Sequence, residues 1–253
     1  MKRILSTIIA VQMGVALLYG SSHVDKTEQA RILYPLPAAI VMNAYRYLGK
    51  LQHFSVDAVT TNDDYFEGKI IATFTHKIHI DLQRPDRLHI DVDGDLKHRS
   101  FYLDRGDFTM VEEDLDYYGK IKVPEKIDSA LDRLFENYKI KTALANILYS
   151  NLDKRLTPKE KGYYFGISQV EGVSCYHIGF SNEVQALQLW IEKGIRPLIR
   201  KFIVIDKTEK YLPRSGTLLH WHLHPEYTPS TFQFIPSDNS VEIVVASFET
   251  EEK

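Results

Sequence analysis

Three histidines alternate along one short stretch, "HWHLH", in which Trp221 and Leu223 separate His220, His222 and His224. Imidazole is a common zinc ligand, so the spacing raises the hypothesis of a metal site and a metal-dependent enzyme. On a β-strand, however, the outer two histidines lie roughly 13 Å apart at about 3.3 Å per residue. Zinc holds its nitrogen ligands at about 2.0–2.1 Å from one point. We therefore predict a solvated strand face without metal. The alternative is two neighbouring histidines joined by a residue of an adjacent strand.

Other candidates for catalysis are weaker. Cys175 stands two residues before His177 in "VSCYHIGF", a spacing that puts both on one strand face, but no third group is placed to orient the histidine. A buried, unreactive thiol is the better interpretation. The sequence contains no Gly-x-Ser-x-Gly, His-Glu-x-x-His, Cys-x-x-Cys or phosphate-binding loop. We predict no catalytic residue, no cofactor and no metal ligand.

Composition narrows the class of protein further. The chain has 253 residues, of which 44% are hydrophobic and 26% charged, with a formal net charge of −3. Mild acidity without a basic stripe argues against nucleic acid as a partner. The single cysteine allows no intramolecular disulfide, and a chain of this length can bury an adequate core without one.

The first 22 residues read differently from the rest. A basic start, "MKR", precedes a nearly continuous apolar run over residues 4–19, and the small residues "GSS" follow. This is the layout of a secretory signal peptide. The run is shorter than the roughly 20 residues of a membrane span, and no cysteine follows it to carry a lipid anchor. We predict a signal peptide over residues 1–22 and a single domain over 23–253. An uncleaved anchor helix is the alternative.

The elements that position these residues follow from apolar spacing. Pro37 can open a helix, whose apolar stripe at helical spacing comprises Ile40, Val41, Ala44, Tyr45, Leu48 and Leu51. From residue 53 the period changes to two. The clearest strand, residues 67–82, has one face made of Ile70, Ala72, Phe74, His76, Ile78, Ile80 and Leu82, and the next strand alternates with Leu88, Ile90 and Val92 inward.

The later chain contains helices and then strands again. Pro124 opens a helix with a stripe of Ile127, Leu131, Leu134, Phe135 and Tyr138. Thr142 can cap a second helix that runs to Leu152. Pro158 can start a short third turn. After Lys161, six alternating segments, from "GYYFGISQV" to "TFQFIP", have the spacing of an antiparallel meander.

Several segments in this order resemble a known family. They are "LGKLQHFSV", "RPDRLHIDVDGD", "FYLDRGDFTMVEEDLDYY", "VEGVSCYHIGF", "LWIEKGIRPLIRKFIV" and "STFQFIP". Together they resemble the LolA/LolB-like superfamily of periplasmic carriers, and more closely the domain-of-unknown-function family 2092, from about Pro37 to Pro236. The chain departs from the family pattern at Arg105, where aspartate is usual before Gly-Lys, and in the C-terminal extension "VEIVVASFETEEK".

The resemblance implies a mainly β, α+β fold. A strongly curved antiparallel sheet of about 10–11 strands forms an incomplete barrel, and helices cover its open concave face. It also implies a periplasmic location and an apolar cavity for acyl chains. The expected ligand is a lipid or an acylated protein. We also expect a partner in the inner or outer membrane of the cell envelope, and a monomeric protein.

Physical chemistry makes a lipid ligand plausible, because an acyl chain of about 16 carbons gains up to about 12 kcal/mol on leaving water, at roughly 0.8 kcal/mol per methylene. The predicted cavity residues are Val41, Tyr45, Leu48, Phe74, His76, Ile78, Ile80, Leu88, Ile90 and Trp221. His76 is more often a core histidine, although it can meet a ligand head group. Two alternatives stay open: a barrel filled by its own side chains, and an envelope sensor or scaffold that uses the fold for protein contact.

Overall fold

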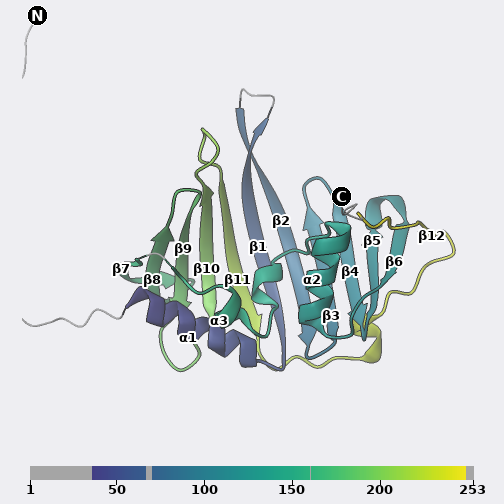
Figure 1. The fold of residues 1–253 in the computed structure, drawn as a ribbon, viewed down its shortest axis with the longest axis horizontal. Helices are drawn as coiled ribbons and strands as arrows, with labels where there is room; N and C mark the ends of the chain where they lie inside the picture. The colour runs from purple at the N-terminus through teal and green to yellow at the C-terminus, as the bar shows by residue number, and fades with distance from the viewer. Residues whose placement is uncertain (1–35, 67–69, 160, 249–253) are drawn as a thin grey trace, which may run out of the picture. The chain divides into compact units, whose positions relative to one another are not determined.

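The computed structural model describes residues 36–66, 70–159 and 161–248, so the predicted signal peptide lies outside the described residues. One sheet of twelve strands runs through this part of the chain, in the order β12-β6-β5-β4-β3-β2-β1-β11-β10-β9-β8-β7. It is open, with β7 and β12 at its edges (Figure 1). The predicted mainly β class and unclosed antiparallel sheet are confirmed.

The elements have the following bounds. The strands are β1 (His53–Phe66), β2 (Ile70–Gln83), β3 (Arg87–Gly94), β4 (His98–Asp104), β5 (Asp107–Glu112), β6 (Tyr117–Lys122), β7 (Tyr163–Val170), β8 (Val173–Ser181), β9 (Gln185–Glu192), β10 (Ile199–Asp206), β11 (Arg214–His222) and β12 (Val241–Glu242). The helices are α1 (Pro37–Lys50), α2 (Ile127–Tyr138) and α3 (Leu152–Arg155), with 3₁₀ turns η1 (Glu113–Leu115), η2 (Ala145–Ile147) and η3 (Pro229–Phe232).

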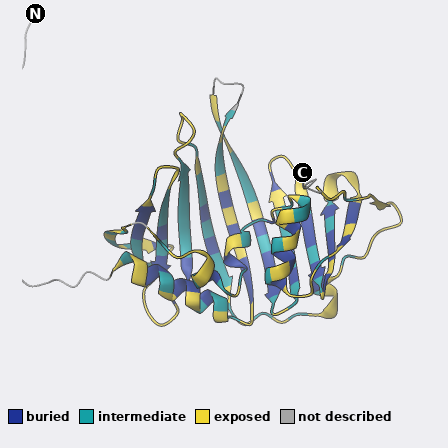
Figure 2. Ribbon diagram, in the orientation of Figure 1, coloured by how far each residue is buried: buried dark blue, intermediate teal, exposed yellow. Residues whose placement is uncertain are grey.

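Strand register divides the sheet into two faces. Val56 pairs with Ile80, which pairs in turn with Ile90 on β3, so the apolar rows of three strands lie side by side. We call this side, which the helices cover, the covered face, and the other side the outer face. Figure 2 shows that buried positions alternate with exposed ones along these strands. A shift of one residue in the strand pairing would expose each apolar row to water. Burial of these rows therefore fixes the register.

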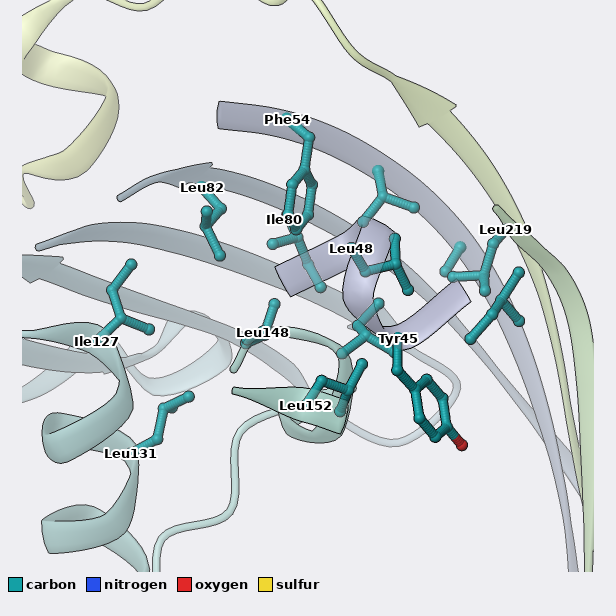
Figure 3. Packing of buried hydrophobic residues seen from close by; sticks show 14 of the residues in the cluster. Tyr45, Leu48, Phe54, Ile80, Leu82, Ile127, Leu131, Leu148, Leu152 and Leu219 are labelled. Carbon is teal, nitrogen blue, oxygen red and sulfur yellow. The ribbon is translucent and has the colours of Figure 1, made fainter. Parts of the chain in front are cut away.

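Helices α1 and α2 cover different parts of this face. Proline at the first position opens α1 as predicted, and its stripe from Ile40 to Leu48 is buried. This helix packs against α3, β8 and β9. Helix α2 contributes Ile127 and Leu131 to the same apolar cluster as Ile80 and Leu82 (Figure 3). Each such fully buried side chain contributes about 1.5–3 kcal/mol.

Several predicted elements differ in detail. The segment "TFQFIP", expected as a strand, instead contains the end of η3 and forms no strand, and among the described residues no turn begins at Pro158. The helix expected over residues 142–152 is replaced by η2 and the short α3, and Leu144 before η2 adopts a left-handed backbone that interrupts a helix. Phe135 is exposed rather than part of the inner stripe. Ile70 is also exposed, because it lies at the end of the long β1–β2 hairpin, away from α1 and α2 (Figure 1).

The C-terminal extension supplies the twelfth strand. Residues 241–242 form β12, which pairs in parallel with β6 at the edge of the sheet. Before it, Phe234 packs against Tyr102 and Tyr118 on the outer face. After it, the Phe248 amide donates to the carbonyl of Asn137 on α2. The segment therefore wraps around this edge, which an unpaired strand would otherwise expose.

Arg84 joins the end of α1 to the sheet. Its side chain is 5% exposed, its Nε donates to the Leu51 carbonyl at 2.9 Å, and its Nη1 donates to the Leu148 carbonyl at 2.7 Å. Burial lowers its pKa, which Asp128 counteracts. Gly49 allows the end of α1 to lie close to the backbone of Ser150, because a Cβ at residue 49 would collide with the carbonyl oxygen of Ser150.

We predict that Arg84→Leu lowers the free energy of unfolding by about 2–4 kcal/mol, since it removes a buried guanidinium and leaves two part-buried carbonyls without their donors. The matched control is Arg99→Leu. Arg99 is 38% exposed and pairs with Glu112, so its loss should cost at most about 1 kcal/mol. Urea denaturation of both variants measures the difference. Equal losses would contradict the assigned role of Arg84.

Candidate functional site

A cavity of about 370 Å³ lies between the helices and one part of the covered face. Its apolar lining from the strands comprises Phe180, Leu187, Leu189, Ile199, Phe202 and Val204, and that from the helical side comprises Tyr45, Ile147, Leu152 and Leu156. Both sets belong to elements that the sequence predicts as amphipathic. The cavity exists because α1 and α3 cover β8, β9 and β10 without filling the space between them.

A bulge in β10 places its side chains. Register between β9 and β10 shifts between Ile199 and Lys201, so Ile199, Phe202 and Val204 all line the cavity although they do not follow one strict alternation. The Trp221 indole supports this region, because its Nε1 donates to the Ile199 carbonyl at 2.8 Å. Trp221 also packs edge-on against Phe54, with ring centroids 5.2 Å apart.

Tyr45 is the polar group of the helical wall. Burial raises the pKa of its hydroxyl to about 12, so the group stays neutral and can donate a hydrogen bond. In Figure 3 its hydroxyl points away from Leu48 and Leu148. The side chain lies among apolar neighbours and also lines the cavity.

Polar residues gather at the margin of the cavity: Asn146, Arg155, Thr157, Lys159, Ser181, Asn182 and Gln185. Arg155 is held in place by Asp132, with its two terminal nitrogens 2.7 and 2.9 Å from the carboxylate oxygens. Hydrogen bonds to Asp132 raise the pKa of the Arg155 guanidinium, so it remains a cation. The cavity is therefore an apolar hollow with a polar margin that includes Arg155 and Lys159.

The ten residues predicted to line a cavity lie in three environments. Tyr45 lines the cavity described above. Fully or almost fully buried in the packed cluster are Val41, Leu48, Ile78, Ile80, Leu88 and Ile90. Half-buried are Phe74, His76 and Trp221. His76 lies opposite Gly94, where a Cβ would come within 2.7 Å of its Cδ2.

Sequence reasoning missed the strand side of the cavity. Alternation in "QALQLWIE" and "LIRKFIV" identifies Leu187, Leu189, Phe202 and Val204 as inward positions, but it does not tell which part of the sheet the helices leave unfilled. That depends on where α1 and α3 cross the strands.

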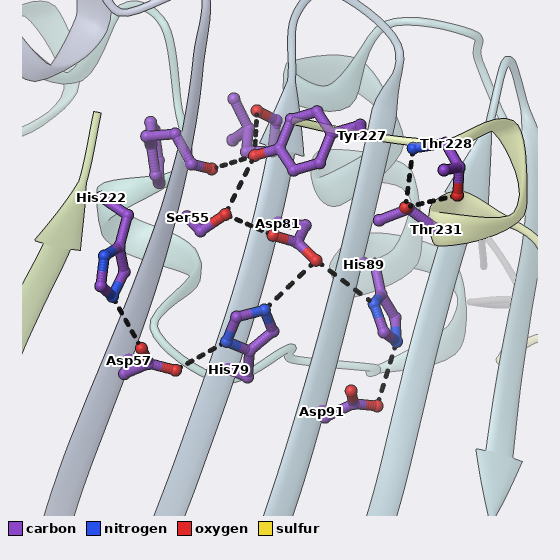
Figure 4. A network of polar contacts seen from close by, with 12 residues as sticks. Ser55, Asp57, His79, Asp81, His89, Asp91, His222, Tyr227, Thr228 and Thr231 are labelled. Carbon is purple, nitrogen blue, oxygen red and sulfur yellow. Dashed lines mark hydrogen bonds and ion pairs between the residues drawn. The ribbon is translucent and has the colours of Figure 1, made fainter. Parts of the chain in front are cut away.

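The outer face carries a different arrangement, a row of alternating acids and imidazoles across four strands (Figure 4). In order it comprises His222 on β11, Asp57 on β1, His79 and Asp81 on β2, and His89 and Asp91 on β3. Successive nitrogen–oxygen distances along the row are 2.9, 2.6, 3.2, 3.8 and 3.0 Å. We call these six residues the histidine–aspartate row.

Asp81 is the buried centre of the row. The Ser55 hydroxyl donates to its carboxylate at 2.5 Å, and Tyr227 donates to the Phe54 carbonyl at 2.6 Å beside it. Burial alone would raise the pKa of Asp81, but hydrogen bonds from His79, His89 and Ser55 hold it well below its usual range. Asp81 is therefore a carboxylate at every physiological pH.

The same contacts keep two histidines charged. The hydrogen bond to Asp81, joined by that to Asp57, raises the pKa of His79 to about 9 against the effect of burial. Burial would lower the pKa of His89, but hydrogen bonds to Asp81 and Asp91 outweigh it and raise the pKa to about 8. At neutral pH His79 and His89 are imidazolium groups, so their contacts with Asp57, Asp81 and Asp91 are ion pairs.

The histidines of "HWHLH" do not converge. His222 contacts Asp57 at 2.9 Å, whereas His220 contacts Glu171 at 3.3 Å, and His224 lies beyond the end of β11. Within the described ranges, no group of three or more His, Cys, Asp or Glu side chains is placed to hold a metal ion. Nor does any helix among the described residues have the length and apolar character needed to cross a membrane.

The row predicts a pH dependence of stability. His79 and His89 bind protons in the folded protein at pH values where an unfolded histidine, with a pKa of about 6.5, has released them. Their contribution is therefore complete below about pH 6.5 and is lost as pH rises through about 8–9. We expect the free energy of unfolding to fall by about 1–2 kcal/mol between pH 6 and 9, after a discount for solvent screening.

Urea denaturation at each pH measures this dependence. His89→Gln should flatten it, and His224→Gln should leave it unchanged. A stability that rises from pH 6 to 9, or a slope that survives in His89→Gln combined with His79→Gln, would contradict the charged row.

We also predict that the triple variant His220→Gln, His222→Gln, His224→Gln is destabilised by less than about 1 kcal/mol, because the side-chain contacts it loses are exposed. Thermal denaturation and zinc analysis of purified protein check this expectation. Stoichiometric zinc in the wild-type protein that disappears in the variant would show that the histidines do bind metal.

Three solved structures show a low similarity to this chain. LprF from Mycobacterium bovis is 11% identical, with a TM-score of 0.49, over 78% of this chain and 97% of that chain. The lipoprotein LppX from Mycobacterium tuberculosis is 9% identical, with a TM-score of 0.46, over 75% and 97%. A LolA superfamily protein from Nitrosomonas europaea is 9% identical, with a TM-score of 0.39, over 79% and 99%. Similarities this low carry no argument about what this chain binds.

The sequence matches assign the family. None of the curated proteins compared with the sequence matches it. A family model described as "Predicted periplasmic protein (DUF2092)" matches residues 38–246, which includes every helix and strand from β1 to β12 and nearly all of α1. The chain therefore belongs to the DUF2092 family of periplasmic proteins, as the resemblance in its sequence indicated.

Proposed function

We propose that this protein binds and carries a lipid or a lipidated partner in the periplasm, and that the cavity between the helices and β8, β9 and β10 holds the acyl chain. The observation that supports this most is the apolar lining of that cavity, which comes from both the sheet and the helices. Its volume of about 370 Å³ falls within the roughly 300–1,000 Å³ of small-molecule sites. We propose binding rather than catalysis, and a monomeric carrier.

The driving force for this function requires no reactive group. Each methylene that leaves water contributes about 0.8 kcal/mol, so a chain of a few carbons already gains a useful affinity. Arg155 and Lys159 lie at the margin, where a polar or anionic head group can remain in contact with water. The Tyr45 hydroxyl, kept neutral by its raised pKa of about 12, can donate to an ester or carboxyl oxygen.

The predicted residues of α1 have distinct roles in this proposal. Val41 and Leu48 are completely buried and hold the helix on the sheet, while Tyr45 between them lines the cavity. Trp221 supports the cavity through its bond to Ile199. Direct ligand contacts by Phe74, His76, Ile78, Ile80, Leu88 and Ile90 remain a prediction. Ile78→Trp tests it, because the added volume should weaken binding only if the ligand reaches that strand.

We predict that Leu187→Trp reduces the affinity for a fluorescent fatty acid at least about tenfold, because an indole in place of an isobutyl group fills space that the acyl chain needs. Leu187 lines the cavity, and its side chain is only half-buried. The fold can therefore accommodate a larger side chain at this position. The matched control is Leu218→Trp, a half-buried position on β11 whose side chain lies on the outer face, and it should bind as wild type.

Titration of each variant, after a cooperative thermal transition has shown that it is folded, measures the effect. Equal binding by folded Leu187→Trp and wild type would rule out this cavity as the acyl site. Absence of binding by the wild-type protein would instead favour the sensor or scaffold alternative.

A further inference from the structure

The margin of the cavity carries charge of one sign. Among the described residues that line the cavity, Arg155 and Lys159 are basic, and none is an aspartate or a glutamate. The chain as a whole has a formal net charge of −3, so acidic residues outnumber basic ones overall. The margin therefore differs from the average surface of the protein, and its charge favours an anionic group.

A second lysine lies beside the strand side of this margin. Lys207, in the β10–β11 turn, donates from its Nζ to the Ser181 hydroxyl at 3.1 Å and to the Asn182 carbonyl at 2.5 Å. Ser181 and Asn182 both line the cavity. The backbone amide of Lys207 also donates to the Val184 carbonyl at 2.9 Å, which fixes the turn in place. Because an ammonium group has three N–H donors, Lys207 can still donate to a ligand that lies beside Ser181.

Arg155 has a different role, because a carboxylate already binds it. Its two terminal nitrogens lie 2.7 and 2.9 Å from the Asp132 oxygens, and its guanidinium lies 3.9 Å from the centre of the Tyr149 ring. Asp132 balances the charge of Arg155, so this pair positions the end of α3. The positive charge that remains for a ligand comes from Lys159 on the helical side and Lys207 on the strand side.

The size of the cavity limits the number of acyl chains. Its volume of about 370 Å³ lies near the lower limit of the roughly 300–1,000 Å³ of small-molecule sites. A further chain would have to displace side chains of the packed cluster, which protein interiors resist because they are close-packed. A lipid with one acyl chain therefore fits this cavity better than a phospholipid or a bacterial lipoprotein, which carry several.

We propose that the cavity takes a single-chain lipid with an anionic head group, either a carboxylate or a phosphate, and that Lys159 and Lys207 contact this head group. The inference rests on the proposed function, because it takes the same cavity as the acyl site. A neutral head group would displace water from the two ammonium groups without balancing their charge, and a cationic one would be repelled. The apolar walls provide affinity for the chain, and the two lysines select the head group.

Four probes that share one chain and differ in the head group test the proposal: laurate, lauryl phosphate, lauryl alcohol and laurylamine. Isothermal titration calorimetry of the wild-type protein, below the critical micelle concentration of each probe, measures the affinities. At least one of the two anions should bind at least about tenfold more tightly than lauryl alcohol, because charge-assisted hydrogen bonds are roughly twice as strong as neutral ones. Laurylamine should bind most weakly. The tighter anion identifies the head group as a carboxylate or a phosphate.

The results separate this inference from the proposed function. Lauryl alcohol that binds as tightly as both anions would overturn the selection of the head group and leave the carrier function in place. Dilauroyl phosphatidic acid that binds more tightly than lauryl phosphate would overturn the restriction to one chain. Absence of binding by every probe would contradict the proposed function, and this inference with it.

Charge reversal tests the two lysines. Lys159→Glu and Lys207→Glu should each weaken binding of the tighter anion at least about tenfold, because an attractive contact becomes a repulsive one, and should leave the affinity for lauryl alcohol unchanged. The matched controls are Lys154→Glu on α3 and Lys210→Glu in the β10–β11 turn. Both control lysines are exposed and are not among the described residues that line the cavity, so these variants should bind the anion as wild type does.

Equal losses in a variant and its control, or an equal loss of affinity for lauryl alcohol in Lys159→Glu, would show that the lysines do not contact the head group. Lys207→Glu also removes the hydrogen bonds to Ser181 and Asn182. Lys159→Glu therefore decides the proposal if Lys207→Glu lacks a cooperative thermal transition.

Discussion

The register of the antiparallel sheet is the constraint on which the rest of the structure depends. Every strand from β1 to β11 sends alternate side chains to two sides, and helices cover only one side. Once Val56, Ile80 and Ile90 align as one apolar row, the intervening positions must face outward. The apolar cavity and the histidine–aspartate row are therefore two results of the same pairing, on opposite faces of the same strands.

The two faces use different physical effects. On the covered face, burial of apolar surface stabilises the fold and leaves a hollow. The proposed acyl chain would gain transfer free energy there as a core side chain does. On the outer face, Asp57, Asp81 and Asp91 pair with imidazolium groups. Water screens these ion pairs, except near the buried Asp81, so they adjust stability modestly and make it depend on pH. The row needs no metal to satisfy its histidines.

Much of the fold follows from particular sequence patterns, and the exceptions have physical causes. Pro37 and the stripe from Ile40 to Leu48 predict α1, and the period of two predicts the inward rows of β1, β2 and β3. The helix predicted over residues 142–152 is absent because Leu144 is left-handed, a tertiary outcome that propensity does not anticipate. Neither the bulge that brings Ile199 and Phe202 to one side nor the path of α1 and α3 over the strands has a local signal. The cavity is displaced from the predicted Ile78 and Ile90 region for that reason.

The contacts of the histidine triplet also have no signal in the local sequence. Strand geometry alone separates the outer histidines, His220 and His224. The acidic partners of His220 and His222, which are Glu171 and Asp57, come from distant parts of the sequence. Native mass spectrometry of protein purified from its own host without detergent shows directly whether the cavity holds an acyl chain. We expect a species heavier than the bare chain by the mass of one acyl-bearing ligand, which solvent extraction removes. A spectrum of the bare chain alone, unchanged after incubation with host lipids, would contradict it.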